Sequence, residues 1–175
     1  MNNADGFAAK LCCGEGNVFR GCISHNNCDD GWDLFTKLES GAISPVIIEN
    51  CVAYGNGTLT DGTVTKGDGN GFKLGGEGIS VKNHLKNSLS FNNNASGIDC
   101  NSNPAIIIDD CISVDNGKTN IGLHYYTNAK LEFALNNNIS FRTKAGDKDD
   151  IPDMIVSDSN YFYDFGISDF HHKML

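Results

Sequence analysis

Residues 30–34 are Asp30-Gly31-Trp32-Asp33-Leu34, and variants of this stretch recur along the chain. Four other segments also place a glycine before a large apolar residue: Asp5-Gly6-Phe7, Asn70-Gly71-Phe72, Ser96-Gly97-Ile98 and Ile121-Gly122-Leu123. The five glycines are 25, 40, 26 and 25 residues apart. The long step holds an insertion, Thr58 to Gly69, rich in Gly, Thr and Asp. A repeat of this length indicates a stacked, solenoid-like fold.

A second strand-like segment follows each copy. These segments are Gly21-Cys22-Ile23-Ser24-His25, Asn50-Cys51-Val52-Ala53-Tyr54, Asn87-Ser88-Leu89-Ser90-Phe91, Asp110-Cys111-Ile112-Ser113-Val114 and Asn137-Asn138-Ile139-Ser140-Phe141. Short apolar runs such as Val46-Ile47-Ile48 lie between the two kinds of segment, and no stretch of a repeat suits a helix. One such coil cannot bury its own apolar side chains, whereas stacked coils can. The pattern predicts an all-β parallel β-helix, and a leucine-rich repeat or a β-sandwich fits it less well.

The prediction places about five coils, with three short strands per coil, in residues 1–143. Residues 144–175 are expected to form a polar loop and a C-terminal partial coil or cap of the same domain. The polar loop is Lys144 to Asp150, and Ile155-Val156 and Tyr161-Phe162-Tyr163 are the candidate cap strands.

Composition narrows the possible functions. The chain has 175 residues, a net charge of -9, 20 Gly and only 3 Pro. Glycine and asparagine favour turns over helices, which disfavours a helical bundle. Lys and Arg form no run, so nucleic-acid binding is not expected. No apolar stretch is long enough for a membrane span, and the sequence predicts no protein partner.

Two columns of like residues are expected inside the stack. Cys22, Cys51 and Cys111 take one position of the second segment, with Ser88 and Asn138 at the same position of the other coils. These side chains are predicted to form an internal ladder of small groups. Asn27, Asn56, Asn93 and Asn116 form a second column, whose amides should hydrogen-bond from coil to coil.

Strand alternation divides the first segment into inward and outward residues. The expected inward columns are Phe7, Trp32, Phe72, Ile98 and Leu123, and then Ala9, Leu34, Leu74, Cys100 and Tyr125. The outward residues between them are Ala8, Asp33, Lys73, Asp99 and His124, and the next outward column is Lys10, Phe35, Gly75, Asn101 and Tyr126. Asp33, Lys73, Asp99 and His124 are thus predicted to line up on four successive coils.

Four carboxylates are predicted to converge beside this outward column: Asp5, Asp29, Asp30 and Asp33. Such a cluster repels itself unless a cation is present, and hard oxygen ligands in irregular geometry suit Ca²⁺ better than zinc. A solvated acidic turn is the alternative. Lys73 lies between Asp33 and Asp99 in the column, so it is either an ion-paired surface lysine or a general base. As a base it needs a lowered pKa, which a nearby Ca²⁺ would favour.

These residues carry a family resemblance. The stretches Asp5-Gly6-Phe7-Ala8-Ala9-Lys10-Leu11, Gly16-Asn17-Val18-Phe19-Arg20-Gly21-Cys22, Asp29-Asp30-Gly31-Trp32-Asp33-Leu34 and Gly69-Asn70-Gly71-Phe72-Lys73-Leu74-Gly75-Gly76 resemble polysaccharide lyase family 9. The family contains pectate lyases and rhamnogalacturonan lyases built on a right-handed parallel β-helix. The resemblance covers about residues 3 to 143, and because family members are longer, it implies a shortened member or a fragment.

The resemblance implies that Asp5, Asp29, Asp30 and Asp33 bind Ca²⁺ and that Lys73 is the Brønsted base. The implied reaction is β-elimination on an acidic polysaccharide that contains uronic acid, either polygalacturonate or rhamnogalacturonan. Lys37, Asp99, His124 and Tyr126 are weaker candidates for substrate contacts. The family also implies an extracellular or periplasmic location, although the numbered chain begins with no signal peptide.

Two other functions remain open from the sequence. One is a non-catalytic β-helix module, such as an adhesin, that only binds carbohydrate. The other is a β-helix glycoside hydrolase, which would use paired carboxylates across the strand face. Asp33 and Asp99 are separated by Lys73 in their column, and this spacing disfavours the hydrolase.

Overall fold

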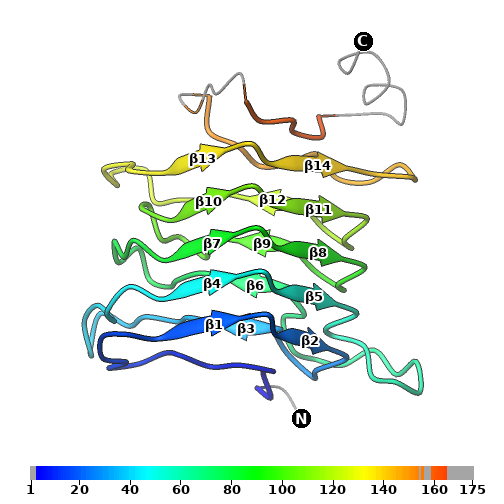
Figure 1. Cartoon of the computed structure of the whole chain (residues 1–175), viewed down its shortest axis with the longest axis horizontal. Helices are drawn as coiled ribbons and strands as arrows, with labels where there is room; N and C mark the ends of the chain where they lie inside the picture. The colour runs from blue at the N-terminus through cyan, green and yellow to red at the C-terminus, as the bar shows by residue number, and fades with distance from the viewer. Residues whose placement is uncertain (1–2, 154, 156–158, 165–175) are drawn as a thin grey trace.

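The computed structural model describes residues 3–153, 155 and 159–164. Throughout this part of the chain the regular secondary structure is β-strand, and every pair of neighbouring strands is parallel. The strands stack into five coils, one above the next (Figure 1). The predicted parallel β-helix, with three short strands in each of the first four coils, is confirmed. None of the described residues forms a helix that could span a membrane.

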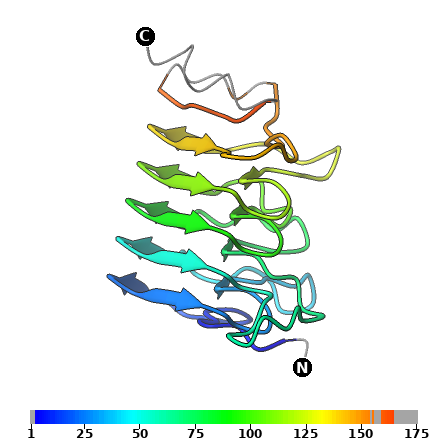
Figure 2. The same cartoon turned by 90° about the vertical axis from the view of Figure 1, so that its right-hand side faces the viewer.

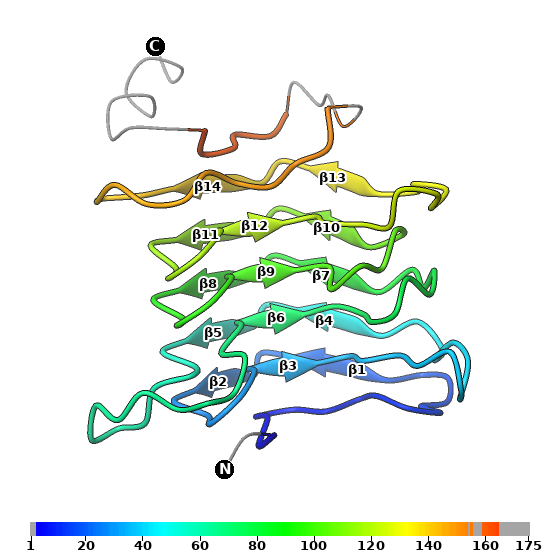
Figure 3. The same ribbon diagram turned by 180° about the vertical axis from the view of Figure 1, so that it is seen from behind.

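Each coil passes through three sheets in turn, and Figure 3 shows the third sheet in front. Sheet 1 contains β1 (Val18–Arg20), β4 (Ile47–Glu49), β7 (His84–Lys86), β10 (Ile107–Asp109) and β13 (Ala134–Asn136). Sheet 2 contains β2 (Ile23–His25), β5 (Val52–Tyr54), β8 (Leu89–Phe91), β11 (Ile112–Val114) and β14 (Ile139–Phe141). Sheet 3 contains β3 (Trp32–Asp33), β6 (Phe72–Lys73), β9 (Ile98–Asp99) and β12 (Ile121–Gly122).

The core is built from single residues repeated at the same place in each coil. From sheet 1 come Ile48, Leu85, Ile108 and Leu135, all buried. From sheet 3 come Trp32, Phe72 and Ile98, and the stacked rings of Trp32 and Phe72 are 4.8 Å apart. Leu34, Leu74 and Cys100 follow them, also buried. Burying large apolar side chains in continuous stacks removes them from water, which supplies the main stabilising free energy.

Sheet 2 points small side chains toward the interior of the coil. The space next to them is taken by hydrogen bonds between these side chains and backbone carbonyl groups. The Ser90 hydroxyl donates to the Gly97 carbonyl at 2.9 Å, and Ser24 makes the same bond to Gly31. Gly71 must be glycine, since a Cβ there would lie 2.4 Å from Ser90 Oγ and 2.5 Å from the Gly97 carbonyl oxygen. The same close approach at Gly6, Gly31 and Gly97 explains four of the five recurring glycines.

The predicted asparagine column is a continuous ladder of amides. Asn27 Nδ2 donates to Asn56 Oδ1 at 2.7 Å, Asn56 to Asn93 at 2.8 Å, and Asn93 to Asn116 at 2.9 Å. Asn116 donates to Asn120 Oδ1 at 3.1 Å. The predicted internal ladder of Cys22, Cys51, Ser88, Cys111 and Asn138 is also present. Burial raises the pKa of the Cys111 thiol to about 12, so this cysteine stays a neutral small group.

The predicted alignment of the last segment is wrong by two residues. Ile121, not Leu123, pairs with Ile98, and Gly122 pairs with Asp99. The register follows the asparagine ladder: in the coils without an insertion, sheet 3 starts at the same spacing after the ladder residue, at Ile98 after Asn93 and at Ile121 after Asn116, so Asn120 takes the place of Gly97. The Ser113 hydroxyl accordingly donates to the Asn120 carbonyl, as Ser90 does to Gly97. His124 and Tyr126 therefore leave their predicted columns, and Tyr125, expected inside, is 41% exposed.

The insertion from Thr58 to Gly69 leaves the stack between β5 and β6 and folds back against it (Figure 3). Thr58 and Val64 form an antiparallel bridge within it. On the return, the Thr65 hydroxyl donates to the Cys28 carbonyl. Gly67 packs so closely on this turn that a Cβ there would lie 2.3 Å from the Cys28 carbonyl oxygen. The insertion thus brings residues 66–68 beside the turn that precedes β3.

Beyond the fifth coil, two short contacts continue the stack. Asp150 forms a parallel bridge with Gly122, and Tyr161 forms one with Ile139. The buried Asp149 carboxylate accepts from the backbone N–H groups of Ile121 and Tyr163, at 2.9 Å each. Figure 2 shows this segment lying across the end of the stack. Of the candidate cap strands, Val156 lies outside the described residues.

Candidate functional site

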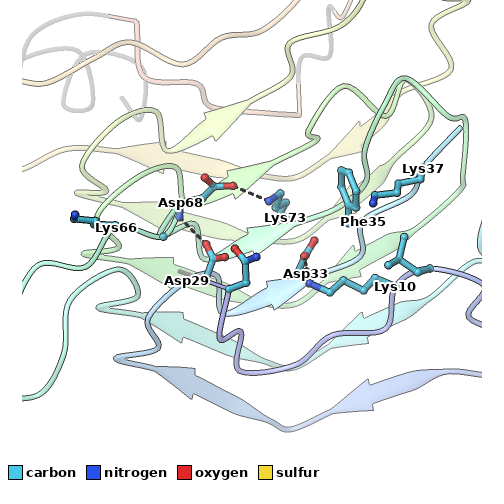
Figure 4. Close-up of a pocket in the computed structure, with 11 residues that line it drawn as sticks. Lys10, Asp29, Asp33, Phe35, Lys37, Lys66, Asp68 and Lys73 are labelled. Atoms are coloured by element: carbon cyan, nitrogen blue, oxygen red, sulfur yellow. Dashed lines mark hydrogen bonds and ion pairs between the residues drawn. The ribbon is translucent and has the colours of Figure 1, made fainter. Parts of the chain in front are cut away.

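A cavity of about 450 Å³ lies on the outer face of sheet 3, over β3 and β6 (Figure 4). Its lining comes from four places: the segment before β1, the β3 strand with its flanking turns, the returning insertion, and Lys73 of β6. The lining residues are Asn3, Lys10, Leu11, Asp29, Asp33, Phe35, Lys37, Lys66, Gly67, Asp68 and Lys73. Most of them are charged, so the cavity suits a polar, charged ligand better than an apolar one.

Lys73 lies in the middle of this face, one coil above Asp33 in the register. Its ammonium nitrogen Nζ is 2.7 Å from Asp68 Oδ2 and 3.2 Å from Asp30 Oδ2. Asp30 is fully buried and Asp68 is exposed. The Phe35 ring lies 5.8 Å from Nζ and adds a weak cation–π contact.

Lys10 joins two further acids across neighbouring coils. Its Nζ is 2.8 Å from Asp5 Oδ2 and 2.6 Å from Asp33 Oδ2. The other oxygen of Asp5 accepts from the Asp30 backbone N–H at 3.2 Å. Asp5 and Asp30 occupy equivalent places on successive coils, as predicted, because Phe7 pairs with Trp32.

Asp29 completes the acidic cluster from the turn before β3. It is buried, and its Oδ1 accepts from the Asp68 backbone N–H at 2.6 Å. Asp30 Oδ1 accepts in a similar way from the backbone and side-chain nitrogens of Asn70, at 2.8 and 3.0 Å. Asp68 of the insertion and Asn70 directly after it therefore fix the orientation of the two carboxylates.

Burial dominates the electrostatics of the cluster. It raises the pKa of Asp30 to about 7, against the opposing attraction of Lys73. It raises the pKa values of Asp29 and Asp33 as well, although Lys10 and Lys73 partly offset the effect on Asp33. For Lys73, burial acts to lower the pKa, but the charges of Asp30, Asp68 and Asp33 outweigh it, so the pKa lies above its usual value.

The donor set fits a hard divalent cation. Among the described residues, Asp33 Oδ1 is a buried carboxylate oxygen that accepts no hydrogen bond, and the buried Asp30 Oδ2 has the Lys73 ammonium at 3.2 Å but no other donor. Asp5, Asp30 and Asp33 each place an oxygen within 4.8 Å of the others, and so do Asp29, Asp30 and Asp68. Buried oxygen atoms without donors are costly unless a cation binds them. All-oxygen sites of this kind match the preferences of Ca²⁺.

The structure brings together the four predicted metal ligands Asp5, Asp29, Asp30 and Asp33 with the predicted base, Lys73. Lys37 also lines the cavity and is exposed. Asp99, His124 and Tyr126 are not among the lining residues that the structure describes. Asp99 does follow Lys73 in its column, and His124 Nδ1 lies 3.7 Å from Asp99 Oδ1 despite the shifted register. The Tyr126 ring packs against Gly78 instead.

Sequence reasoning missed Asp68 and Lys66, and assigned no role to Lys10. Asp68 and Lys66 belong to the insertion, which has no counterpart in the repeat and therefore no predicted place. Lys10 was assigned to the outward column beside Asp33. The signal that would have identified it is this adjacency: an outward lysine next to two predicted acidic ligands is placed to pair with them.

The fold and the site together define a parallel β-helix protein with an acidic, lysine-containing cavity on one sheet. The chain belongs to the family described as Pel9A-like, right-handed β-helix region, which matches residues 1–138. The predicted membership of polysaccharide lyase family 9 is thereby confirmed.

Two named relatives cover most of the chain. Over 163 residues it is 53% identical to "Pectate lyase L" of Thermoclostridium stercorarium, covering 93% of this chain and 13% of that protein. Over 164 residues it is 42% identical to "Pectate disaccharide-lyase" of Dickeya chrysanthemi, covering 91% of this chain and 20% of that protein. The chain thus spans a fifth or less of the length of these two relatives.

Two solved structures share the fold. The crystal structure of pectate lyase Pel9A aligns with a TM-score of 0.72 at 31% identity, over 91% of this chain and 38% of that one. A rhamnogalacturonan lyase aligns with a TM-score of 0.71 at 28% identity, over 91% of this chain and 42% of that one.

Proposed function

We propose that the protein is a Ca²⁺-dependent lyase that cleaves a pectic, uronic-acid-containing polymer by β-elimination, with Lys73 as the Brønsted base. The observation that carries the proposal is the cavity on sheet 3, where a cluster of mostly buried carboxylates lies against Lys73 and includes a buried oxygen, Asp33 Oδ1, that accepts no hydrogen bond among the described residues. The names of the relatives and of the aligned structures support the pectic substrate class. Such polymers lie outside the cytoplasm, in keeping with an extracellular or periplasmic location.

Asp5, Asp29, Asp30 and Asp33 would hold the cation. When bound, Ca²⁺ would neutralise the acidic cluster and the substrate carboxylate, and would weaken the attraction that keeps Lys73 protonated. The bound cation would thereby remove the repulsion between the acidic cluster and an acidic polymer.

Lys73 must act as a neutral amine to accept a proton. In the structure, the ammonium group of Lys73 contacts Asp30 and Asp68. Loss of one ammonium proton to solvent is therefore the step that activates the base. The neutral amine then takes the proton from C5 of the uronic acid. The electron pair of that C–H bond forms the C4–C5 double bond, and the C4–O bond to the neighbouring sugar breaks. The leaving oxygen takes a proton from solvent.

Two exposed lysines at the cavity are assigned to binding the polymer. Lys37 and Lys66 are exposed and lie on opposite sides of the lining, as Figure 4 shows. Their charges match the repeated carboxylates of a polyuronate, and we assign them to carboxylate contacts on either side of the cleavage point. The relatives include a lyase of each polymer type by name, so the proposal extends to pectic polymers as a class.

The decisive experiment follows the ultraviolet absorbance of the unsaturated product on polygalacturonate and on rhamnogalacturonan, with Ca²⁺ and with a chelator. A Ca²⁺-dependent rise supports the lyase. Lys73→Ala should lower kcat by about 10²-fold or more, the usual contribution of a general base. Lys130→Ala is the control, since Lys130 is an exposed lysine paired with Glu132. Full activity in Lys73→Ala would show that another group is the base, and reducing sugar without absorbance would show a hydrolase.

A further inference from the structure

We infer that Lys10 is an exchangeable counter-cation of the metal site: it pairs with Asp5 and Asp33 in the free protein, and a divalent cation releases it. This inference rests on the proposed function and concerns the regulation of the same site. It starts from the position of the ammonium, which bridges two of the four carboxylates assigned to the cation.

The charges around the cavity favour such an exchange. Five carboxylates meet here, from Asp5, Asp29, Asp30, Asp33 and Asp68, and within the described part of the chain two ammonium groups contact them. Lys10 and Lys73 therefore leave the cluster with an excess of negative charge. A divalent cation neutralises that excess, and once it binds, the positive charge of Lys10 beside it becomes repulsive.

Asp33 is the residue on which the two cations would compete. Its Oδ2 is 2.6 Å from Lys10 Nζ, whereas its Oδ1 is buried and accepts no hydrogen bond among the described residues. One carboxylate thus faces Lys10 with one oxygen and offers the other to the cluster. Asp5 is divided similarly, because its Oδ2 contacts Lys10 and its Oδ1 accepts from the Asp30 backbone.

The position of Lys10 also allows its ammonium group to move away from Asp5 and Asp33. Its side chain is 26% exposed, compared with 12% for Lys73, and it lines the open cavity. Its long, flexible stem allows the ammonium to move into the cavity while its backbone stays in place. The released ammonium of Lys10 would then lie in the part of the cavity assigned to the polymer. There it could pair with a uronate carboxylate. Cation binding and polymer binding would then reinforce each other.

The test measures Ca²⁺ binding by titration calorimetry in the wild type, Lys10→Met and Lys10→Arg. Lys10→Met keeps much of the stem and removes the charge. It should bind Ca²⁺ at least about tenfold more tightly, because the competing charge is gone. Lys10→Arg should stay close to the wild type. Lys130→Met removes one positive charge from an exposed site in the fifth coil and should leave the affinity unchanged.

A second readout is the rise in melting temperature on adding Ca²⁺. It should be larger in Lys10→Met, since tighter binding stabilises the folded state more. Equal affinity in the wild type and Lys10→Met would overturn the exchange but leave the calcium site standing. Weaker binding in Lys10→Met would also overturn it, and would show that Lys10 positions the ligands. If neither protein bound Ca²⁺, both the exchange and the calcium site of the proposed function would be wrong.

Discussion

Lys73 Nζ lies 2.7 Å from Asp68 Oδ2, so the insertion between β5 and β6 places a carboxylate directly on the central lysine of sheet 3. The returning loop is tied to the same cluster a second time, because the Asp68 backbone N–H donates to Asp29. An element outside the repeat therefore controls the charge of the group at the centre of the cavity.

Replacing Asp68 should shift the pH dependence of activity. The Asp68 charge favours protonated Lys73, so Asp68→Asn should lower the Lys73 pKa, with an effect limited by the solvent exposure of Asp68. The acid limb of kcat/KM against pH should then move to lower pH. Asp61→Asn in the same loop is the control, because the Asp61 carboxylate accepts from the Thr63 backbone N–H and is not among the described residues that line the cavity. An unchanged acid limb in Asp68→Asn would contradict the assignment of Lys73 as the base.

Calcium binding should weaken in acid. Burial raises the pKa of Asp30 to about 7, so below that pH the carboxyl is increasingly neutral and a proton competes with the cation. The affinity should fall by up to about tenfold per pH unit below pH 7 and level off above it. Calorimetric titrations at several pH values check this. Asp30→Asn should bind more weakly at every pH and lose most of the dependence. A constant wild-type affinity across pH 7 would exclude Asp30 as a ligand.

Gly71→Ala should destabilise the fold strongly. The added methyl would lie 2.4 Å from Ser90 Oγ and 2.5 Å from a backbone oxygen, so the coils must separate locally. We expect a loss of about 2 kcal/mol or more in the free energy of unfolding, measured with urea. Gly14→Ala is the matched control, because nothing lies within 4 Å of its added Cβ. Similar losses in both variants would mean that the close approach at Gly71 is not what requires glycine.

Asn93 is the best place to test the ladder. Its Oδ1 accepts from the backbone and side-chain nitrogens of Asn56, and its Nδ2 donates to Asn116. Asn93→Ala leaves these buried groups without partners, which should cost about 2 to 4 kcal/mol in urea unfolding. Asn136→Ala removes one exposed bond to Asp109 and should cost about 0.5 kcal/mol or less. A small effect at Asn93 would show that the amides are dispensable.

The repeat predicted the fold and most of the cavity because both depend on periodic positions. Asp33 and Lys73 are neighbours in the register, and a period is sufficient to place them. The last repeated segment, at β12, was misaligned because Gly122 was matched to the other glycines, whereas the amide ladder through Asn116 and Asn120 sets the register. Asp68 was unpredictable on the same grounds: a loop that folds back on its own coil follows no period.

The position of the cavity in the stack affects how such a chain can change its length. Its acids and its four lining lysines precede β7, while each strand pairs only with the strands directly above and below. An extra turn spliced in between β10 and β13, or one removed there, would leave these contacts untouched. The far part of the stack can therefore lengthen or shorten in evolution without disturbing the cavity.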